Sequence, residues 1–141
     1  MPRKLFTASI ILLVLLTAIS ISTAGSGINM QEGKWEIASK VEMQGMPMTM
    51  PPVTYTQCLT KADLVPQSSQ TLQGCNISEV KVVDNTVTWS IQCSSESGDM
   101  KGIGKITYSG NSLEGTIKVT MGKPGMEMTS HINGHRIGEC N

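Results

Sequence analysis

Apolar and polar residues alternate along most of the chain from Gly33 onward. A period of two places successive side chains on opposite faces of a sheet, so this pattern predicts half-buried β-strands. The first segment shows it clearly, with one face formed by Trp35, Ile37, Val41 and Met43 and the other by Lys34, Glu36, Lys40 and Glu42. A returning strand then begins at Val53 and reaches Cys58.

Two later hairpins are predicted with defined registers, because each contains a two-residue turn between alternating segments. With Asp84-Asn85 as the first turn, the expected pairs are Val82 with Val87 and Val80 with Trp89. With Gly110-Asn111 as the second, they are Tyr108 with Leu113, Ile106 with Gly115, Gly104 with Ile117, and Gly102 with Val119. Glycines opposite large apolar residues are typical of the concave face of a strongly curved sheet.

The last strands follow from a turn at Lys123-Pro124-Gly125-Met126, which has Pro and Gly where a type II turn needs them. This turn places Met126, Met128, Ser130 and Ile132 on the inner face and His131 and His135 on the outer face. Two strand histidines four positions apart are roughly 13 Å apart, too far to share one metal ion. We therefore expect both to be surface residues.

The fold class that these segments predict is all-β. Thr60-Lys61-Ala62-Asp63 has the form of a helix start, which predicts one or two helical turns up to Val65, before Pro66. We expect a curved antiparallel sheet or partly closed barrel of about seven strands, mostly a meander, with this one short helix. The expected core contains Trp35, Ile37, Trp89, Ile91, Ile106, Tyr108, Ile117 and Val119.

Residues 1–24 predict export through a cleaved signal peptide. Arg3 and Lys4 form a short basic start, residues 5–21 are almost entirely apolar, and Ser22-Thr23-Ala24 provides the small residues before a cleavage site. The remaining residues 25–141 are the right size for a single domain and carry a small acidic excess. That charge argues against nucleic-acid binding, and no membrane span is expected after cleavage.

The four cysteines, Cys58, Cys75, Cys93 and Cys140, predict two disulfides in an oxidising compartment. Three connectivities are possible, and we favour Cys58 with Cys75 and Cys93 with Cys140. Zinc binding is the competing use, but the sequence has no Cys-x-x-Cys pair.

Four sequence blocks together carry a resemblance to a known family: Asn29 to Glu36, Gly45 to Pro52, Gln57 to Thr60, and Arg136 to Cys140. In their order and spacing they resemble a family of small exported bacterial proteins, domain of unknown function 3617. The resemblance implies a bacterial and periplasmic setting, and it brings no catalytic residues with it.

The methionines suggest the first candidate chemistry, since the chain contains 10 of them. Met43, Met46, Met48 and Met50 are crowded around Pro47 and Pro51, and thioethers are ligands for Cu(I) and Ag(I). The alternative is that this loop is flexible apolar cover or a contact surface for a partner. A second group, Met100, Met121, Met126 and Met128, is expected at the opposite end of the sheet and therefore unable to share an ion with the first.

We find no catalytic constellation in the sequence and expect no enzyme activity. G-x-S-x-G and H-E-x-x-H motifs are absent, and no cysteine is left free as a nucleophile. The favoured function is a periplasmic β-domain that binds an unidentified apolar ligand, or a periplasmic protein, on its concave face. The expected contact residues are Tyr108, Met121, Met126 and Met128, with Cu(I) or Ag(I) carriage by the Met-rich loop as the alternative.

Overall fold

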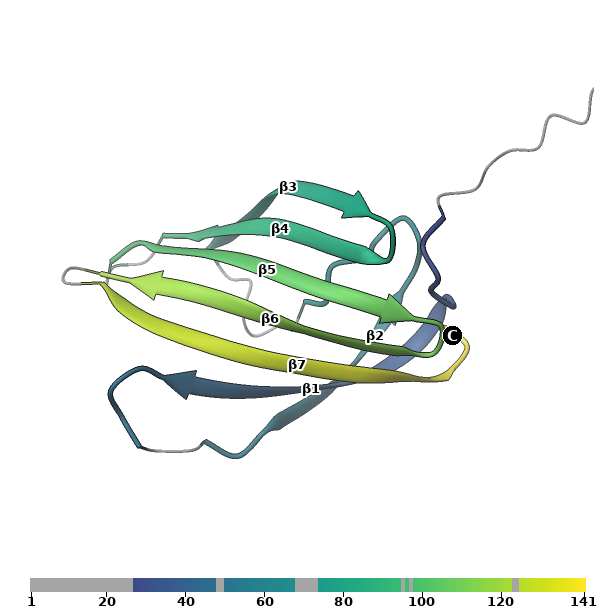
Figure 1. Cartoon of the computed structure of the whole chain (residues 1–141), viewed down its shortest axis with the longest axis horizontal. Coiled ribbons are helices and arrows are strands. Elements are labelled where there is room, and N and C mark those ends of the chain that lie inside the picture. Colours follow the sequence, from purple (N-terminus) through teal and green to yellow (C-terminus); the bar gives the residue numbers. More distant parts are fainter. Residues whose placement is uncertain (1–26, 48–49, 68–73, 95, 97, 123–124) are drawn as a thin grey trace, which may run out of the picture.

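The computed structural model describes residues 27–47, 50–67, 74–94, 96, 98–122 and 125–141. Their strands are β1 (Gly33–Met43), β2 (Val53–Leu59), β3 (Cys75–Val83), β4 (Thr86–Cys93), β5 (Met100–Ser109), β6 (Ser112–Met121) and β7 (Met126–Gly138). They form one open, curved sheet in the order β2-β1-β7-β6-β5-β4-β3, with all neighbours antiparallel (Figure 1). The predicted all-β class, dominated by a meander from β3 to β7, is confirmed.

The predicted hairpin registers are confirmed with one exception. Every expected pair between β5 and β6 is present, and Val82 lies opposite Val87. Val80 and Trp89 do not form a simple pair, because a β-bulge in β3 places both Glu79 and Val80 opposite Trp89. Glu79 adopts a positive φ of 53° at this bulge, and its carboxylate accepts a hydrogen bond from Ser90. The extra residue bends an edge strand that would otherwise continue in plain register.

The hydrophobic core covers much of the concave face, and the predicted inner and outer faces are correct. Of the expected core, Trp35, Ile37, Trp89, Ile106 and Tyr108 are buried, Ile91 and Ile117 pack against them partly buried, and Val119 is half-buried. Lys105 and Lys118, expected outside, are exposed.

The two ends of the concave face are built differently. One end, which we call the closed end, carries the turns after β3 and β5, and is filled by buried side chains from outside the meander: Ile28, Met30, Leu59, Leu64 and Val65. The N-terminal part of this filling is fixed by a bridge between Met30 and Gly110. The opposite end, where β1 connects to β2, β4 to β5 and β6 to β7, is called the open end.

The segment after β2 forms a tight turn where a helix was predicted. Asp63 N donates to both the carbonyl oxygen (3.0 Å) and Oγ1 (3.2 Å) of Thr60, so the hydrogen bond of a helix start does form. The chain then closes an isolated bridge between these two residues, and Pro66 shortly after cannot continue a helix. The predicted short helix is therefore wrong.

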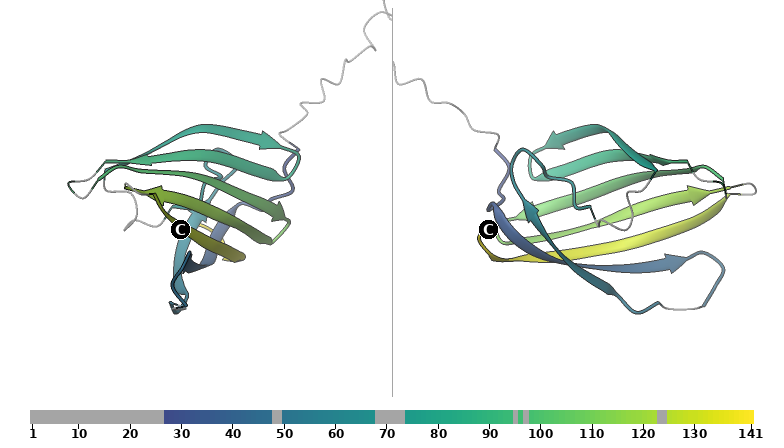
Figure 2. Two further views of the ribbon diagram at one scale, coloured as in Figure 1. Left: turned by 60° about the vertical axis from the view of Figure 1, so that its left-hand side comes forward. Right: turned by 180° about the vertical axis from the view of Figure 1, so that it is seen from behind.

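From this turn the chain crosses the concave face. Tyr108 Oη donates a buried hydrogen bond of 2.6 Å to the Leu64 carbonyl, and Gln67 N donates to Gln57 Oε1 at 2.7 Å. Seen from behind, β2 and the chain that follows it pass in front of β5 to β7 (Figure 2). We call residues 64–67 the crossing segment. It covers the middle strands of the sheet, near their closed end.

Two disulfides are present, as predicted, but the favoured partners are wrong. The bonds join Cys58 to Cys140 and Cys75 to Cys93, and no described cysteine is free. Cys75 and Cys93 lie directly opposite each other in β3 and β4. Cys58 and Gly138, near Cys140, pair with Lys34 from its two sides, so β1 brings that second pair together.

Removing the Cys58–Cys140 bond should cost more stability than removing the Cys75–Cys93 bond. The sequence separations are 82 and 18 residues, and a longer closed loop restricts the unfolded chain more. The chain-entropy relation gives a difference of about 1.3 kcal/mol between the two double Cys→Ser variants. Urea unfolding of both variants measures it, and a larger loss for the Cys75 and Cys93 variant would contradict this account.

Tyr108 should make the domain sensitive to alkaline pH. Burial raises the pKa of Tyr108 above its ordinary range, with smaller contributions from Asp63 and Tyr55. The unfolded chain releases this proton near pH 10, whereas the folded protein keeps it, so the contribution is complete below about pH 10 and is lost as pH rises further. Tyr108→Phe should cost about 1 kcal/mol at pH 7 and make the decline above pH 10 shallower. Unfolding free energies between pH 7 and 11 test this, with Tyr55→Phe as the comparison.

Candidate functional site

The open end of the concave face is an apolar surface that the core does not fill. We call it the open-end surface, and its residues come from β1, β5, β6 and β7: Val41, Met43, Met100, Ile117, Val119, Met121, Met126 and Met128. Met126 is 51% exposed and the others are half-buried. Each lies on the inner face by alternation with the buried core residues of the same strand. This part of the concave face is partly exposed.

The structure brings the two methionine groups to the same end of the sheet. Met43 in β1 lies directly opposite Met128 in β7, so the expectation that the groups lie at opposite ends is wrong. The reason is the link between β2 and β3, which returns along the sheet, so that both strands start at the open end. A simple reversal at that link would have separated the groups.

The methionines of the connection between β1 and β2 are arranged less compactly. Met43 is the last residue of β1 and lies on the inner face, while Met46 and Met50 are 52% and 44% exposed in the connection. Met48 lies outside the described residues. The strand methionines therefore form the part of the sulfur-rich region that lies on the sheet.

Trp89 presents an unusual polar group beside the open-end surface. Its side chain is 2% exposed, yet its indole Nε1 has no hydrogen-bond partner. The edge of the indole that carries Nε1 lies over Gly104, which is the cross-strand neighbour of Ile117. A buried N–H without an acceptor costs about 1–3 kcal/mol, so such a group in a native structure calls for a physical explanation, such as strain or a bound water or ion.

Tyr108, expected to contact a ligand, belongs to the closed-end core. It is 1% exposed, its hydroxyl is hydrogen-bonded to Leu64, and its ring packs edge-on against Trp35 at a centroid distance of 5.8 Å. Its part in the molecule is to hold the crossing segment in place. The other expected contact residues, Met121, Met126 and Met128, all lie on the open-end surface.

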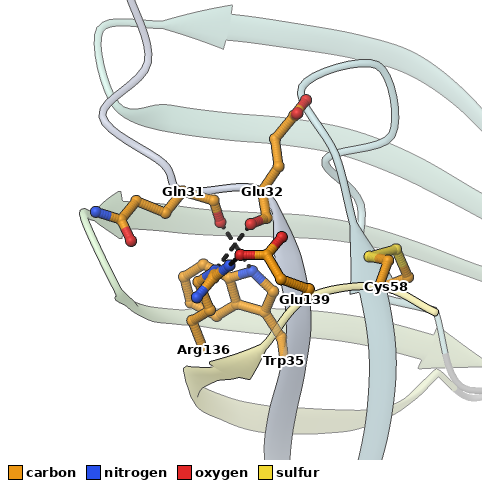
Figure 3. Close-up of polar contacts among 7 residues, drawn as sticks. Gln31, Glu32, Trp35, Cys58, Arg136 and Glu139 are labelled. Atoms are coloured by element: carbon orange, nitrogen blue, oxygen red, sulfur yellow. Dashed lines mark hydrogen bonds and ion pairs between the residues drawn. A yellow bond between two sulfur atoms is a disulfide. The ribbon is translucent and has the colours of Figure 1, made fainter.

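A polar clasp joins the start of β1 to the end of β7 at the closed end. Arg136 Nε donates to the Glu32 carbonyl at 2.8 Å, and its Nη2 pairs with the Glu139 carboxylate. The guanidinium lies in front of the Trp35 indole, whose Nε1 donates to the Gln31 carbonyl at 3.1 Å (Figure 3). The Cys58–Cys140 disulfide lies next to this group. The clasp satisfies two backbone acceptors, the carbonyl oxygens of Gln31 and Glu32.

The outer face carries the two histidines, as predicted. Both are exposed: His131 pairs with Glu42 at 3.4 Å and His135 with Glu36 at 3.8 Å. Two open grooves of about 410 and 400 Å³ run over this face, lined mainly by polar residues of β5, β6 and β7. Among the described residues, no three His, Cys, Asp or Glu side chains are grouped so that they could hold a metal ion.

These features define a small disulfide-bonded all-β domain with one open, curved sheet. The chain belongs to the family of proteins of unknown function DUF3617, whose sequence profile matches residues 30–140. This confirms the resemblance seen in the sequence. No curated protein and no solved structure matches the chain. No helix in the described residues is long and apolar enough to cross a membrane.

Gly104 should be essential for the position of the Trp89 ring. A Cβ at residue 104 would overlap the indole, whereas a Cβ at Gly138, also in a strand, would meet no atom within 4 Å. We expect Gly104→Ala to lower the free energy of unfolding by about 1–3 kcal/mol, as overpacked cores do. Gly138→Ala should leave it unchanged within about 0.5 kcal/mol. Denaturation followed by circular dichroism compares them, and equal stabilities would contradict the packing described.

Proposed function

We propose that this domain is a non-enzymatic, exported module that binds an apolar ligand on its open-end surface in the bacterial periplasm. Two disulfides fit an oxidising extracellular compartment, and the basic and apolar pattern of residues 1–24 supports export through a cleaved signal peptide. Small-molecule sites are typically concave and mostly apolar, with few polar groups. The open-end surface has this character.

The observation that carries the proposal is the unpartnered indole N–H of Trp89. In a core this apolar, a bound molecule with one acceptor oxygen would satisfy that N–H once the indole turns its buried Nε1 edge away from Gly104, while the apolar part of the molecule covers the neighbouring surface. The ligand class is therefore an apolar molecule with a carbonyl, carboxyl or ether oxygen. A neutral hydrogen bond of this kind contributes about 0.5–1.5 kcal/mol, and the apolar contact supplies the rest of the affinity.

A small ligand fits better than a protein partner because of the shape of the face. The chain after β2 crosses the concave face, and Leu64, Val65 and Pro66 are buried there. The accessible part is the open-end surface, which lies beside this crossing segment. A protein partner would instead need a broad contact of roughly 800 Å² on each side.

A non-enzymatic role is supported by the side chains of the open-end surface. They are Val, Ile and Met residues, with Ser130 in β7 opposite Val41 and Ile117 as a polar neighbour. None of the described residues on this surface titrates near neutral pH, so the surface offers no general acid or base.

Two fluorescent probes separate the hydrogen bond from the apolar contact. Parinaric acid has a carboxyl acceptor, whereas diphenylhexatriene is a hydrocarbon. We expect the wild-type protein to bind both probes. Trp89→Phe should weaken the binding of parinaric acid by about tenfold, because one hydrogen bond is lost, and should change the binding of diphenylhexatriene little. Titrations of fluorescence at constant protein concentration provide the measurement.

Matched surface variants show where the probes bind. Val119→Ser on the concave face should weaken both probes, whereas Ile103→Ser, an exposed apolar residue in β5, should weaken neither. If the wild-type protein bound neither probe, the apolar-ligand function would be refuted. If Ile103→Ser alone abolished binding, the ligand would lie on the outer face of the sheet, which would contradict the proposed site.

A further inference from the structure

We propose that the open end of the concave face also binds one soft monovalent metal ion, Cu(I) or Ag(I), through the thioethers of Met100, Met121, Met126 and Met128. The site goes beyond the apolar-ligand function and differs from a site in the connection between β1 and β2, because its ligands come from three adjacent strands. It shares part of the open-end surface but requires sulfur where an apolar ligand requires only hydrophobic area.

The strand registers place these four residues next to one another. Met126 lies directly opposite Met121, and Met121 lies directly opposite Met100. Met128 lies two residues from Met126 on the same face and is diagonal to Met121. Directly opposed Cβ atoms are about 4.5–5.5 Å apart and diagonal residues about 7–8 Å, so four flexible side chains surround one point above Met121.

The curvature of the sheet favours convergence of the sulfur atoms. Side chains on a concave face lean toward one another. The position above Gly102, next to this row in β5, is occupied by Val119, whose Cγ2 a Cβ at residue 102 would meet at 3.0 Å. Met has three rotatable bonds beyond Cα and can bring its sulfur to a shared ion without backbone change.

The distribution of residue types also favours a site over simple apolar cover. The buried closed end uses Ile, Leu, Val, Trp and Tyr, with Met30 as the methionine of the buried core. Strand positions favour β-branched and aromatic side chains, which would have covered the open end equally well. Here the sheet instead has methionine at directly paired positions in β5, β6 and β7.

The chemistry of the surface selects a soft ion. Thioethers are neutral, soft ligands that suit Cu(I), whereas carboxylates and carbonyls suit Mg²⁺ and Ca²⁺. No carboxylate or imidazole lies on the open-end surface among the described residues. Met126 is 51% exposed, so an ion has access from solvent. The neighbouring Val119 and Ile117 provide the apolar surroundings that a weakly hydrated monovalent ion accepts.

Silver titration of the disulfide-bonded protein tests the site, because Ag(I) needs no reductant. Native mass spectrometry should show one Ag(I) per chain. The triple variant Met100→Leu, Met121→Leu, Met126→Leu should bind more than about 100-fold more weakly, since loss of direct ligands exceeds the 10–100-fold typical of outer-shell changes. Met-to-Leu exchanges keep volume and usually cost less than about 1.5 kcal/mol each, so folding should survive, as circular dichroism would verify.

The matched control replaces the methionines of the connection, Met46, Met48 and Met50, by leucine, and should bind Ag(I) as the wild type does. Affinity should also be unchanged between pH 7 and pH 5, because thioethers do not take up protons, whereas a histidine site would lose the ion. Diphenylhexatriene binding should persist in the strand triple variant, which separates failure of the metal site from failure of the apolar-ligand function. No Ag(I) uptake by the wild type, loss of uptake in the control variant, or loss of uptake at pH 5 would each overturn the proposal.

Discussion

The course of the chain between β2 and β3 decides which parts of this protein meet. The Thr60–Asp63 turn directs Leu64 and Val65 into the core, and the buried hydrogen bond from Tyr108 to the Leu64 carbonyl fixes them over the sheet. The next strand, β3, begins at Cys75 at the open end, which is the end at which β2 also begins. The pairing of Cys58 with Cys140 and the meeting of Met43 with Met128 both follow from this path, whereas Cys75 and Cys93 meet within the β3–β4 hairpin. A link that simply reversed direction would have separated the first two pairs.

The two ends of the concave face solve different physical problems. At the closed end, rigid aromatic and branched side chains are buried, and the Arg136 clasp joins the start of β1 to the end of β7. At the open end the same face carries flexible, half-buried methionines and an indole N–H with no acceptor. Those choices sacrifice some stability, since an unsatisfied buried donor is unfavourable and Met specifies packing poorly. A small domain tolerates that cost most easily where a ligand offsets it.

The alternation of apolar and polar residues was sufficient to predict the sheet, whereas contacts between distant parts of the chain could not be predicted from it. Alternation and two-residue turns gave the registers of β5 with β6, and the inner positions of Trp35 and Ile106, because these depend on neighbours along a hairpin. The alternation of residues in the sequence gives no sign of the bulge at Glu79. The helix predicted from Thr60 failed because its capping hydrogen bond serves equally well in a closed turn. The filling of the closed end by Ile28 and Met30 has no periodic signal at all.

The four sequence blocks that carry the family resemblance divide by physical role. Asn29 to Glu36 and Arg136 to Cys140 form the clasp, and Gln57 to Thr60 supplies a disulfide partner, a core leucine and the turn that redirects the chain. Packing, hydrogen bonding and covalent closure account for these three. The described part of Gly45 to Pro52 contains exposed methionines and prolines at the open end. It borders the open-end surface but lies outside the core, so core packing does not account for this fourth block.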